Sequence, residues 1–259
     1  MSTVELQHLE HGITTVRLNR PEALNALTWE AMERFADIVS VLEEEKDLRA
    51  IVIYGADGAF CSGGDLYQLH DAQSQEDGQR LAEIMGDALE RWAALPCVTI
   101  AAIEGPAFGG GAEIALACDL RIMAEDARFG MMHVKLAIPP AWGGGQRLLH
   151  LIGYGRALEW LTTARVISAD EAHEYGIANA TAATGHAVQK GLDLAQRIAG
   201  HDPGAVRAVK RLLRAGLHRS HEAATRVERE EFPPLWAAQP HLEASQAFVN
   251  RKRNRSTDQ

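Results

Sequence analysis

Two glycine-rich segments of the chain have the composition needed to surround one substrate oxygen with main-chain N–H groups. Residues 59–66 read Ala-Phe-Cys-Ser-Gly-Gly-Asp-Leu, and residues 105–113 read Gly-Pro-Ala-Phe-Gly-Gly-Gly-Ala-Glu. Glycine lets a substrate approach the backbone and permits dihedral angles that turn amides inward. Amides directed at developing negative charge are often the largest catalytic contribution. The pair predicts an oxyanion hole for an enolate, and neither segment matches the G-x-G-x-x-G or Walker phosphate-binding patterns.

Glu113 is a titratable residue near this predicted oxyanion hole. The apolar residues that follow it predict a short helix that begins near Gly110. The N–H of Gly110 is then an unsatisfied first-turn donor with the helix dipole behind it, which suits an oxyanion. A carboxylate one turn further on is costly to bury without a purpose, so we expect Glu113 to act as a general acid or base. The alternative is a carboxylate that only balances the helix dipole.

Alternating strands and helices must hold these segments in place. Residues 4–9 and 13–18 alternate in polarity and predict a hairpin. Short apolar runs bounded by glycine or proline predict buried parallel strands. The further elements expected are a helix after the N-cap Thr28, a strand at 50–54, a helix at 75–95, a strand at 98–103, a short helix after Gly111 and a strand at 120–123. The chain thus repeats strand, glycine loop and helix.

Helical periodicity replaces strands from about Ser168 onward. Ser168 and Glu171 have the spacing of a capping box. The helices expected here cover residues 168–175, 187–199, 205–217, 221–232 and 241–251. We divide the chain into an α/β core of residues 1–195, which contains the site, and a C-terminal helical region of residues 196–259. Because no low-complexity linker separates them, we expect the helical region to pack on the core or on a neighbouring subunit.

The amino-acid composition limits the kinds of molecule that the protein is expected to bind. The 259 residues are 46% hydrophobic, which supports a sizeable core, and the formal net charge is −9. This acidic balance argues against a nucleic-acid surface, which needs a basic footprint. The basic cluster at residues 251–255 is either an anion contact or a frayed, solvated end.

The cysteines and the N-terminus indicate the compartment. Cys61, Cys97 and Cys118 cannot all pair and do not have metal-ligand spacing, so we expect reduced thiols and no metal site. The first residues have neither the basic nor the apolar region of a secretory leader, and no apolar run approaches membrane-spanning length. We therefore expect a cytoplasmic protein without a membrane partner.

Taken in order, several motifs resemble the crotonase (enoyl-CoA hydratase/isomerase) superfamily over nearly the whole chain. These are the two glycine segments, the opening run Leu-Asn-Arg-Pro-Glu-Ala-Leu-Asn-Ala-Leu at 18–27, and Ala-Cys-Asp-Leu-Arg at 117–121 followed by Phe-Gly at 129–130. The resemblance implies an α/β fold, a crotonase-like spiral of repeated β-β-α units with a C-terminal helical region. It also implies homo-trimers, commonly assembled as dimers of trimers, and acyl-CoA substrates. No cofactor is expected, because coenzyme A is part of the substrate.

The resemblance also assigns residues to the site. The two thioester-oxygen donors are Gly64 and Gly110, and Glu113 coincides with the first of two catalytic glutamates in hydratases. The implied coenzyme A contacts are Ala23, Leu24, Ser62, Leu66 and, from a neighbouring subunit, Phe248 and Arg251. Family members often have lysine where this chain has Glu22 and Tyr67, so two phosphate-facing charges are missing. Asp65 and Asp119 are expected to serve as a helix cap and a partner within the fold.

The second catalytic glutamate of hydratases is replaced by His133. Histidine exchanges a proton near neutral pH, so acid–base chemistry is retained, but hydration by two cooperating carboxylates cannot simply be transferred. His133, with the 61–66 and 140–144 segments, also resembles the branch that decarboxylates short alkylmalonyl-CoA thioesters. Loss of CO2 generates the thioester enolate directly and needs no base.

Three activities follow from these residues. We place an acyl-CoA lyase of the enoyl-CoA hydratase type first, because it is the commonest activity among similar sequences. A short alkylmalonyl-CoA decarboxylase is the alternative, and a catalytically silent acyl-CoA binder is the third. The retained Glu113 argues against the silent binder, and the negative net charge argues against an RNA-binding relative.

Overall fold

Two compact units make up the chain, Met1–Ala199 and Gly200–Gln259. The computed structural model describes residues 2–257, and it describes side chains as far as residue 250. The strands are β1 (Val4–His8), β2 (Ile13–Leu18), β3 (Ala50–Gly55), β4 (Val98–Ile103), β5 (Pro106–Phe108), β6 (Leu120–Ala124), β7 (Arg128–Gly130), β8 (Val166–Ser168) and β9 (Ala180–Ala182).

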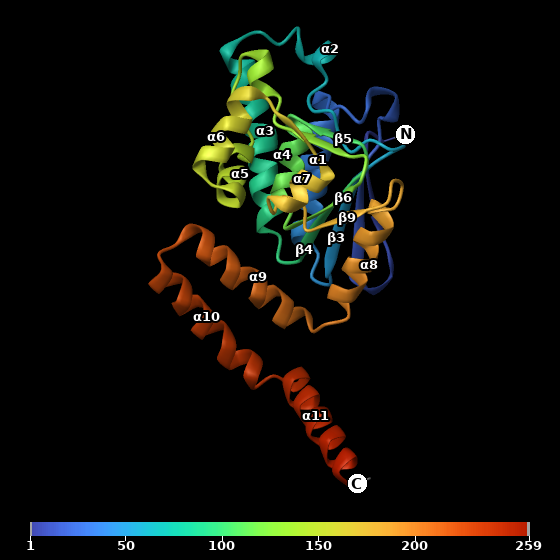
Figure 1. Cartoon of the computed structure of the whole chain (residues 1–259), viewed down its shortest axis with the longest axis vertical. Coiled ribbons are helices and arrows are strands. Elements are labelled where there is room, and N and C mark those ends of the chain that lie inside the picture. Colours follow the sequence, from blue (N-terminus) through green and yellow to red (C-terminus); the bar gives the residue numbers. More distant parts are fainter. Residues whose placement is uncertain (1, 258–259) are drawn as a thin grey trace. The chain divides into compact units, whose positions relative to one another are not determined.

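The first unit contains eight of the α-helices of the described chain and three short 3₁₀ turns. The α-helices are α1 (Trp29–Glu44), α2 (Leu66–Leu69), α3 (Gln75–Ala94), α4 (Gly110–Ala117), α5 (Gly144–Ile152), α6 (Tyr154–Thr163), α7 (Ala169–Glu174) and α8 (Ala187–Ala199). The 3₁₀ turns are η1 (Glu10–Gly12), η2 (Pro21–Ala23) and η3 (His133–Leu136). The expected strand, loop and helix repeat is therefore present (Figure 1).

A six-stranded sheet forms the centre of this unit, with the strand order β1-β2-β3-β4-β6-β9. The β1–β2 hairpin is antiparallel, as predicted, and pairs Val4 with Leu18. The remaining neighbours are parallel, and Ile13 of β2 lies beside Ala50 of β3. Strands β3 and β4 are almost wholly buried, which explains their continuous apolar sequences.

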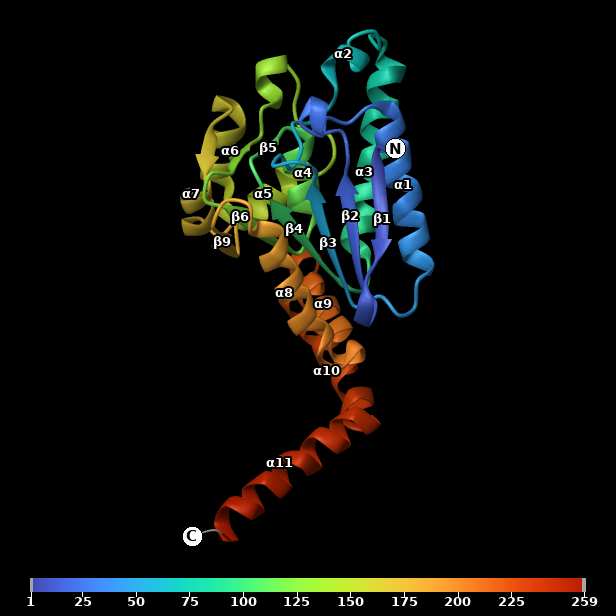
Figure 2. The same ribbon diagram turned by 90° about the vertical axis from the view of Figure 1, so that its right-hand side faces the viewer.

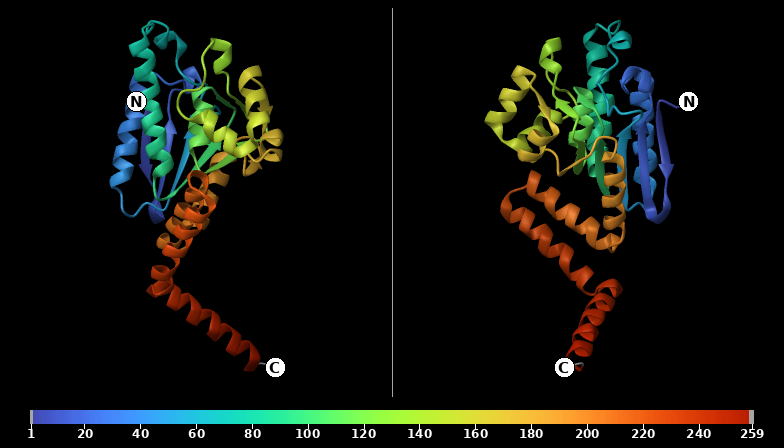
Figure 3. Two further views of the ribbon diagram at one scale, coloured as in Figure 1. Left: turned by 90° about the vertical axis from the view of Figure 1, so that its left-hand side faces the viewer. Right: turned by 45° about the vertical axis from the view of Figure 1, so that its right-hand side comes forward.

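Helices cover both faces of the sheet. Figures 2 and 3 show α1 and α3 on one face and α8 on the other. The rings of Phe35 in α1 and Trp92 in α3 lie 5.4 Å apart and join these two helices. On the opposite face, Gly191 of α8 lies close to Val52 and Ala102 of the sheet. The apolar face of each of these helices is therefore directed at the sheet.

A second, three-stranded sheet has the order β5-β7-β8. Strands β5 and β7 are parallel and pair Ala107 with Phe129, and β8 is antiparallel to β7. Each strand has only three residues, which is too short to leave a periodic signal in the sequence. This small sheet leads directly into α4 and η3, and so it determines where their side chains lie.

Helix α4 is buried along its whole length. At its C-terminal end, the guanidinium of Arg121 donates to the carbonyl oxygens of Ala115 and Cys118, and its Nε donates to that of Ile177. Burial lowers the pKa of Arg121, and a cation is favourable beside the negative end of a helix. Arg121 thus satisfies the carbonyls that the last turn of α4 cannot.

The predicted helix caps are present. The side chains of Thr28, Asp65 and Ser168 accept hydrogen bonds from the first turns of α1, α2 and α7, and Ser168 forms a complete capping box with Glu171. No helix in the described part of the chain is long and apolar enough to cross a bilayer.

The second unit consists of α9 (Pro203–His218), α10 (His221–Trp236) and α11 (Gln239–Thr257). Helices α9 and α10 lie side by side, and the Arg211 guanidinium donates two hydrogen bonds of 2.7 and 2.6 Å to the Glu231 carboxylate. This contact lowers the pKa of Glu231. The three helices predicted from the sequence for this region are therefore found, with α10 and α11 somewhat longer than expected.

Candidate active site

The two glycine segments lie beside each other. Cys61 and Ala107 form a parallel bridge, with Cys61 N–H donating to Pro106 O and Phe108 N–H donating to Cys61 O. A second bridge joins Gly64 to Leu27, through hydrogen bonds from Leu27 N–H to Gly63 O and from Asp65 N–H to Leu27 O. In a parallel bridge these bonds use the groups that flank Gly64, so its own N–H points away from Leu27.

The free N–H groups of Gly64 and Gly110 belong to backbone segments that touch. Gly63 has a φ of +104°, a value that favours glycine, and a Cβ added to it would lie 3.3 Å from Gly110 N. In the described part of the chain neither the Gly64 N–H nor the Gly110 N–H forms a hydrogen bond. Gly110 is the first residue of α4, where the helix itself offers no acceptor.

Glu113 is almost completely buried in the first turn of α4, with 1% of its surface exposed. Its Oε1 accepts hydrogen bonds from the N–H groups of Trp142, at 2.9 Å, and Gly144, at 3.0 Å. Its Oε2 lies 2.9 Å from Nε2 of His133. These three donors satisfy most of the acceptor capacity of the carboxylate, so Glu113 has a single fixed orientation.

His133 is brought to Glu113 by the small sheet. Strand β7 pairs with β5, and Gly109 N–H donates to Gly130 O at 2.9 Å. The chain then turns into η3, whose first residue is His133. The His133 side chain is 12% exposed. The two residues that the sequence analysis proposed for acid–base chemistry are thus in direct contact.

The other ring nitrogen of His133 has a different environment. Nδ1 is buried and, among the described residues, has no hydrogen-bond partner. A carboxylate can only accept, so Nε2 carries the proton in the contact with Glu113. Nδ1 is therefore the atom of this pair that is left to interact with a substrate, and Glu113 fixes the tautomer that presents it.

Four of the predicted coenzyme A residues lie in or beside the first glycine segment, Ser62 and Leu66 within it and Ala23 and Leu24 next to Ser62. Ser62 N–H donates to Leu24 O at 3.0 Å, and its hydroxyl donates to Ala23 O at 3.3 Å. Leu24 and Leu66 have 52% and 55% of their surfaces exposed, which leaves apolar surface available to a ligand. Phe248 is exposed in the second unit, and the side chain of Arg251 lies outside the described residues.

The two aspartates have the structural roles that the sequence analysis expected. Asp65 caps α2 and lies 2.9 Å from Nη1 of Arg20. Asp119 accepts hydrogen bonds from the main chain and the hydroxyl of Thr99, at 2.8 and 3.1 Å. Neither side chain contacts Glu113 or His133 in these interactions.

Cys61 lies inside the first glycine segment. Its thiol is fully buried, and it accepts a hydrogen bond from Gly63 N–H at 3.4 Å. Burial raises the pKa of Cys61 to about 12. The thiol is therefore protonated at neutral pH and unsuited to nucleophilic chemistry. All three cysteines are buried and free of disulfide bonds, which agrees with the expectation of reduced thiols.

No residue type in the sequence indicates that Trp142 and Gly144 hold Glu113. Their contribution comes from main-chain amides in the turn that leads into α5, and backbone donors leave no residue-type signal. The only indication is the Trp-Gly-Gly sequence that follows Pro139, Pro140 and Ala141, a composition typical of a turn.

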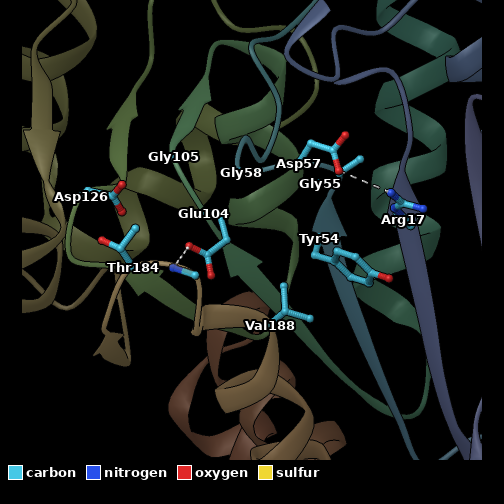
Figure 4. A pocket seen from close by; sticks show the side chains of 12 residues that line it. Arg17, Tyr54, Gly55, Asp57, Gly58, Glu104, Gly105, Asp126, Thr184 and Val188 are labelled. Carbon is cyan, nitrogen blue, oxygen red and sulfur yellow. Dashed lines mark hydrogen bonds and ion pairs between the residues drawn. The ribbon is translucent and has the colours of Figure 1, made fainter. Parts of the chain in front are cut away.

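A separate cavity of about 470 Å³ lies at the ends of β3 and β4 beside α8 (Figure 4). Its most buried carboxylate, Glu104, accepts hydrogen bonds from the N–H groups of Gly185 and Ala187, at 3.0 and 2.6 Å. Arg17 and Asp57 lie 3.9 Å apart at its rim. Glu104 thus accepts hydrogen bonds from main-chain groups at the N-terminus of α8. No predicted site residue lines this cavity.

Within the described residues, no group of three or more His, Cys, Asp or Glu side chains is arranged to hold a metal ion.

The sequence matches a known protein family over almost its whole length. Residues 8–259 match the model of the family described as enoyl-CoA hydratase/isomerase. The chain is 32% identical over 244 residues to ethylmalonyl-CoA decarboxylase of Xenopus laevis, an alignment that covers 93% of this chain and 82% of the relative. It is 31% identical over 245 residues to short-chain-enoyl-CoA hydratase of Clostridium acetobutylicum, with 94% of each chain covered.

The solved structures agree with the fold. The crystal structure of enoyl-CoA hydratase from Bacillus anthracis superposes with a TM-score of 0.91 and 34% sequence identity, over 96% of each chain. The expected crotonase-like α/β fold with a C-terminal helical region is therefore confirmed.

Proposed function

Since the chain belongs to the enoyl-CoA hydratase/isomerase family, we propose that it is an acyl-CoA lyase that stabilises a thioester enolate between Gly64 and Gly110. Both N–H groups are free in the described chain, and the loops that contain them touch. Two donors aimed at the thioester oxygen stabilise the enolate more than the ground-state carbonyl, because the charge develops only during the reaction. The dipole of α4 adds to this effect at Gly110.

The reaction that the site supports best is decarboxylation of a short alkylmalonyl-CoA. The observation that carries this proposal is the direct contact between His133 Nε2 and Glu113 Oε2, at 2.9 Å. Hydration by two carboxylates needs a water held between two acceptors. Here one acceptor is a histidine, and Glu113 already receives three donors. In this pair Glu113 orients the histidine, and the two side chains contact each other where a bound water would have to lie.

In the proposed reaction the bond between the α-carbon and the substrate carboxylate breaks, and CO2 leaves. The electron pair stays on the α-carbon and the thioester oxygen as the enolate that Gly64 and Gly110 stabilise. His133 in its protonated form delivers a proton from Nδ1 to the α-carbon, and solvent returns a proton to Nδ1. Glu113 holds the imidazole in place and balances its positive charge.

Hydration of a short enoyl-CoA is the second candidate activity. The similarity to the clostridial short-chain-enoyl-CoA hydratase supports it, and Glu113 is present as the first glutamate. In this case Glu113 must release His133 to bind water. Both reactions use the same oxyanion hole, so they differ only in what the acid–base pair does.

Coenzyme A binding and assembly complete the proposal. Ala23, Leu24, Ser62 and Leu66 are proposed to contact coenzyme A, with Phe248 and Arg251 supplied by a neighbouring subunit. The second unit exposes large apolar side chains, namely Leu213, Leu217, Phe232, Trp236, Leu242 and Phe248. Exposed apolar surface of this extent is typical of a subunit interface, which supports a homo-trimer or a dimer of trimers.

A panel of thioesters tests the proposed reaction. Purified protein is incubated with methylmalonyl-CoA, ethylmalonyl-CoA and crotonyl-CoA, and the products are identified by mass spectrometry. We expect propionyl-CoA and butyryl-CoA from the first two substrates, with little hydration of crotonyl-CoA. Rapid hydration without decarboxylation would reverse the order of the two candidates. Turnover of none of the three would contradict the lyase assignment for short acyl groups.

A further inference from the structure

The indole ring of Trp142 lies directly against Gly110. A Cβ added to Gly110 would lie 2.2 Å from Cζ3 and 2.7 Å from Cη2 of the ring, so the two are in van der Waals contact only because Gly110 has no side chain. Trp142 is 5% exposed. It belongs to the turn before α5, whereas Gly110 begins α4.

The ring is held at two points. The Trp142 indole N–H donates to Leu81 O in α3 at 3.0 Å, and its main-chain N–H donates to Glu113 Oε1 at 2.9 Å. Rotation of the ring away from Gly110 breaks the first bond and leaves a buried donor unpaired. The ring is therefore a fixed surface that spans the space between the oxyanion donor and α3.

The distances place this surface within reach of a bound acyl group. An oxyanion lies about 3 Å from its amide donor, and the Gly110 amide nitrogen is about 1.5 Å from the Cα that the ring contacts. Glu113, whose carboxylate accepts from the Trp142 N–H, lies in the same first turn of α4 as Gly110. The first few carbon atoms of an acyl chain that starts at the thioester therefore approach the indole.

From this geometry we infer that Trp142 is the specificity-determining wall of the acyl pocket and restricts the enzyme to short acyl groups. The inference rests on the proposed position of the thioester at Gly64 and Gly110. A well-packed, hydrogen-bonded ring does not yield to extra methylene groups without strain. Short acyl groups fit in front of it, whereas longer ones must displace it.

Binding of unreactive thioesters tests the inference independently of the reaction. The affinities of butyryl-CoA and octanoyl-CoA are measured by calorimetry for the wild type, Trp142→Ala and Trp142→Phe. We expect the wild type to bind butyryl-CoA at least tenfold more tightly than octanoyl-CoA. Trp142→Ala should reduce this ratio to about threefold or less, and Trp142→Phe should give an intermediate value because a smaller ring remains.

Trp160→Phe is the matched control, since Trp160 is also buried but packs edge-to-face against Tyr175, which is not a predicted site residue. Its chain-length ratio should equal that of the wild type. Circular dichroism establishes that each variant folds, and Trp142→Met replaces Trp142→Ala if the alanine variant does not. An unchanged ratio in the folded variants, or equal wild-type affinity for both thioesters, overturns the inference. Failure of the wild type to bind either thioester instead overturns the proposed acyl-CoA site.

Discussion

Glu113 and His133 are hydrogen-bonded to each other through Oε2 and Nε2, although twenty positions separate them in the chain. Two main-chain amides hold the other oxygen of Glu113, and the second ring nitrogen of His133 is left without a partner among the described residues. This arrangement determines which atom of the pair is available to a substrate. It also explains why the pair suits proton delivery better than water binding.

Replacing Glu113 by Gln should lower kcat by about 10²- to 10⁴-fold, the usual range for loss of acid–base function. The amide group cannot accept from all three donors, so His133 loses its fixed tautomer. Glu104→Gln is the matched control, because Glu104 is also a buried carboxylate that accepts two main-chain N–H groups. It should reduce the free energy of unfolding by about 1–3 kcal/mol and leave kcat within twofold. Equal kcat losses in both variants would assign Glu113 a structural role.

Replacing His133 by Glu should shift the reaction from decarboxylation to hydration. The variant places a second carboxylate opposite Glu113, and two acceptors can then hold a water molecule between them. We expect decarboxylation of ethylmalonyl-CoA to fall by about 10²-fold, because the proton donor of the enolate is lost. Hydration of crotonyl-CoA, which is measured by the loss of crotonyl-CoA absorbance, should rise at least tenfold. A variant that loses both activities would argue against a hydration-competent site.

A crystal structure with butyryl-CoA should place the thioester oxygen about 2.7–3.1 Å from the nitrogens of both Gly64 and Gly110. This saturated thioester has no carboxylate to lose, so it remains intact during crystallisation. The expected geometry follows from the contact between Gly63 and Gly110 N and from the free N–H of Gly64. A thioester oxygen bound elsewhere would remove the basis for the proposed mechanism.

The buried thiol of Cys61 should make stability fall with alkaline pH. Burial raises its pKa from 9.0 to about 12, so the unfolded chain loses the proton at a lower pH than the folded protein. The stabilisation is therefore complete below about pH 9 and is lost as the pH rises toward 12. Cys61→Ala should show a shallower decline of unfolding free energy over this interval, by up to about 1.4 kcal/mol per pH unit. Parallel curves for the two proteins would contradict this prediction.

The sequence predicts much of the first unit because its elements have strong local signals. The boundaries of α8 and β4 agree with the expected ranges 187–199 and 98–103, since α8 has one apolar face and β4 is a continuous apolar run. Thr28 and Ser168 mark helix starts through side-chain caps that require no knowledge of the fold. Helices α5 and α6, by contrast, were not anticipated.

The candidate site is only partly predictable for a physical reason. The residue types of Glu113 and His133 suggest proton exchange, but their contact depends on the pairing of β5 with β7, which have three residues each. Pairing of such short strands is decided by tertiary packing and not by local propensity. The main-chain amides that hold Glu113 are equally unpredictable from the sequence, because every residue except proline has an N–H group.

Helix α4 and turn η3 differ in how readily natural substitution can alter them. Every residue of α4 is enclosed by the core, so exchanging Gly110 or Glu113 disturbs packing on several sides at once. In η3, by contrast, His133 is partly buried and the other three residues are exposed, so an exchange at position 133 chiefly changes the contact with Glu113. Divergence toward new chemistry in such a scaffold is expected to begin at position 133, while α4 is inherited intact.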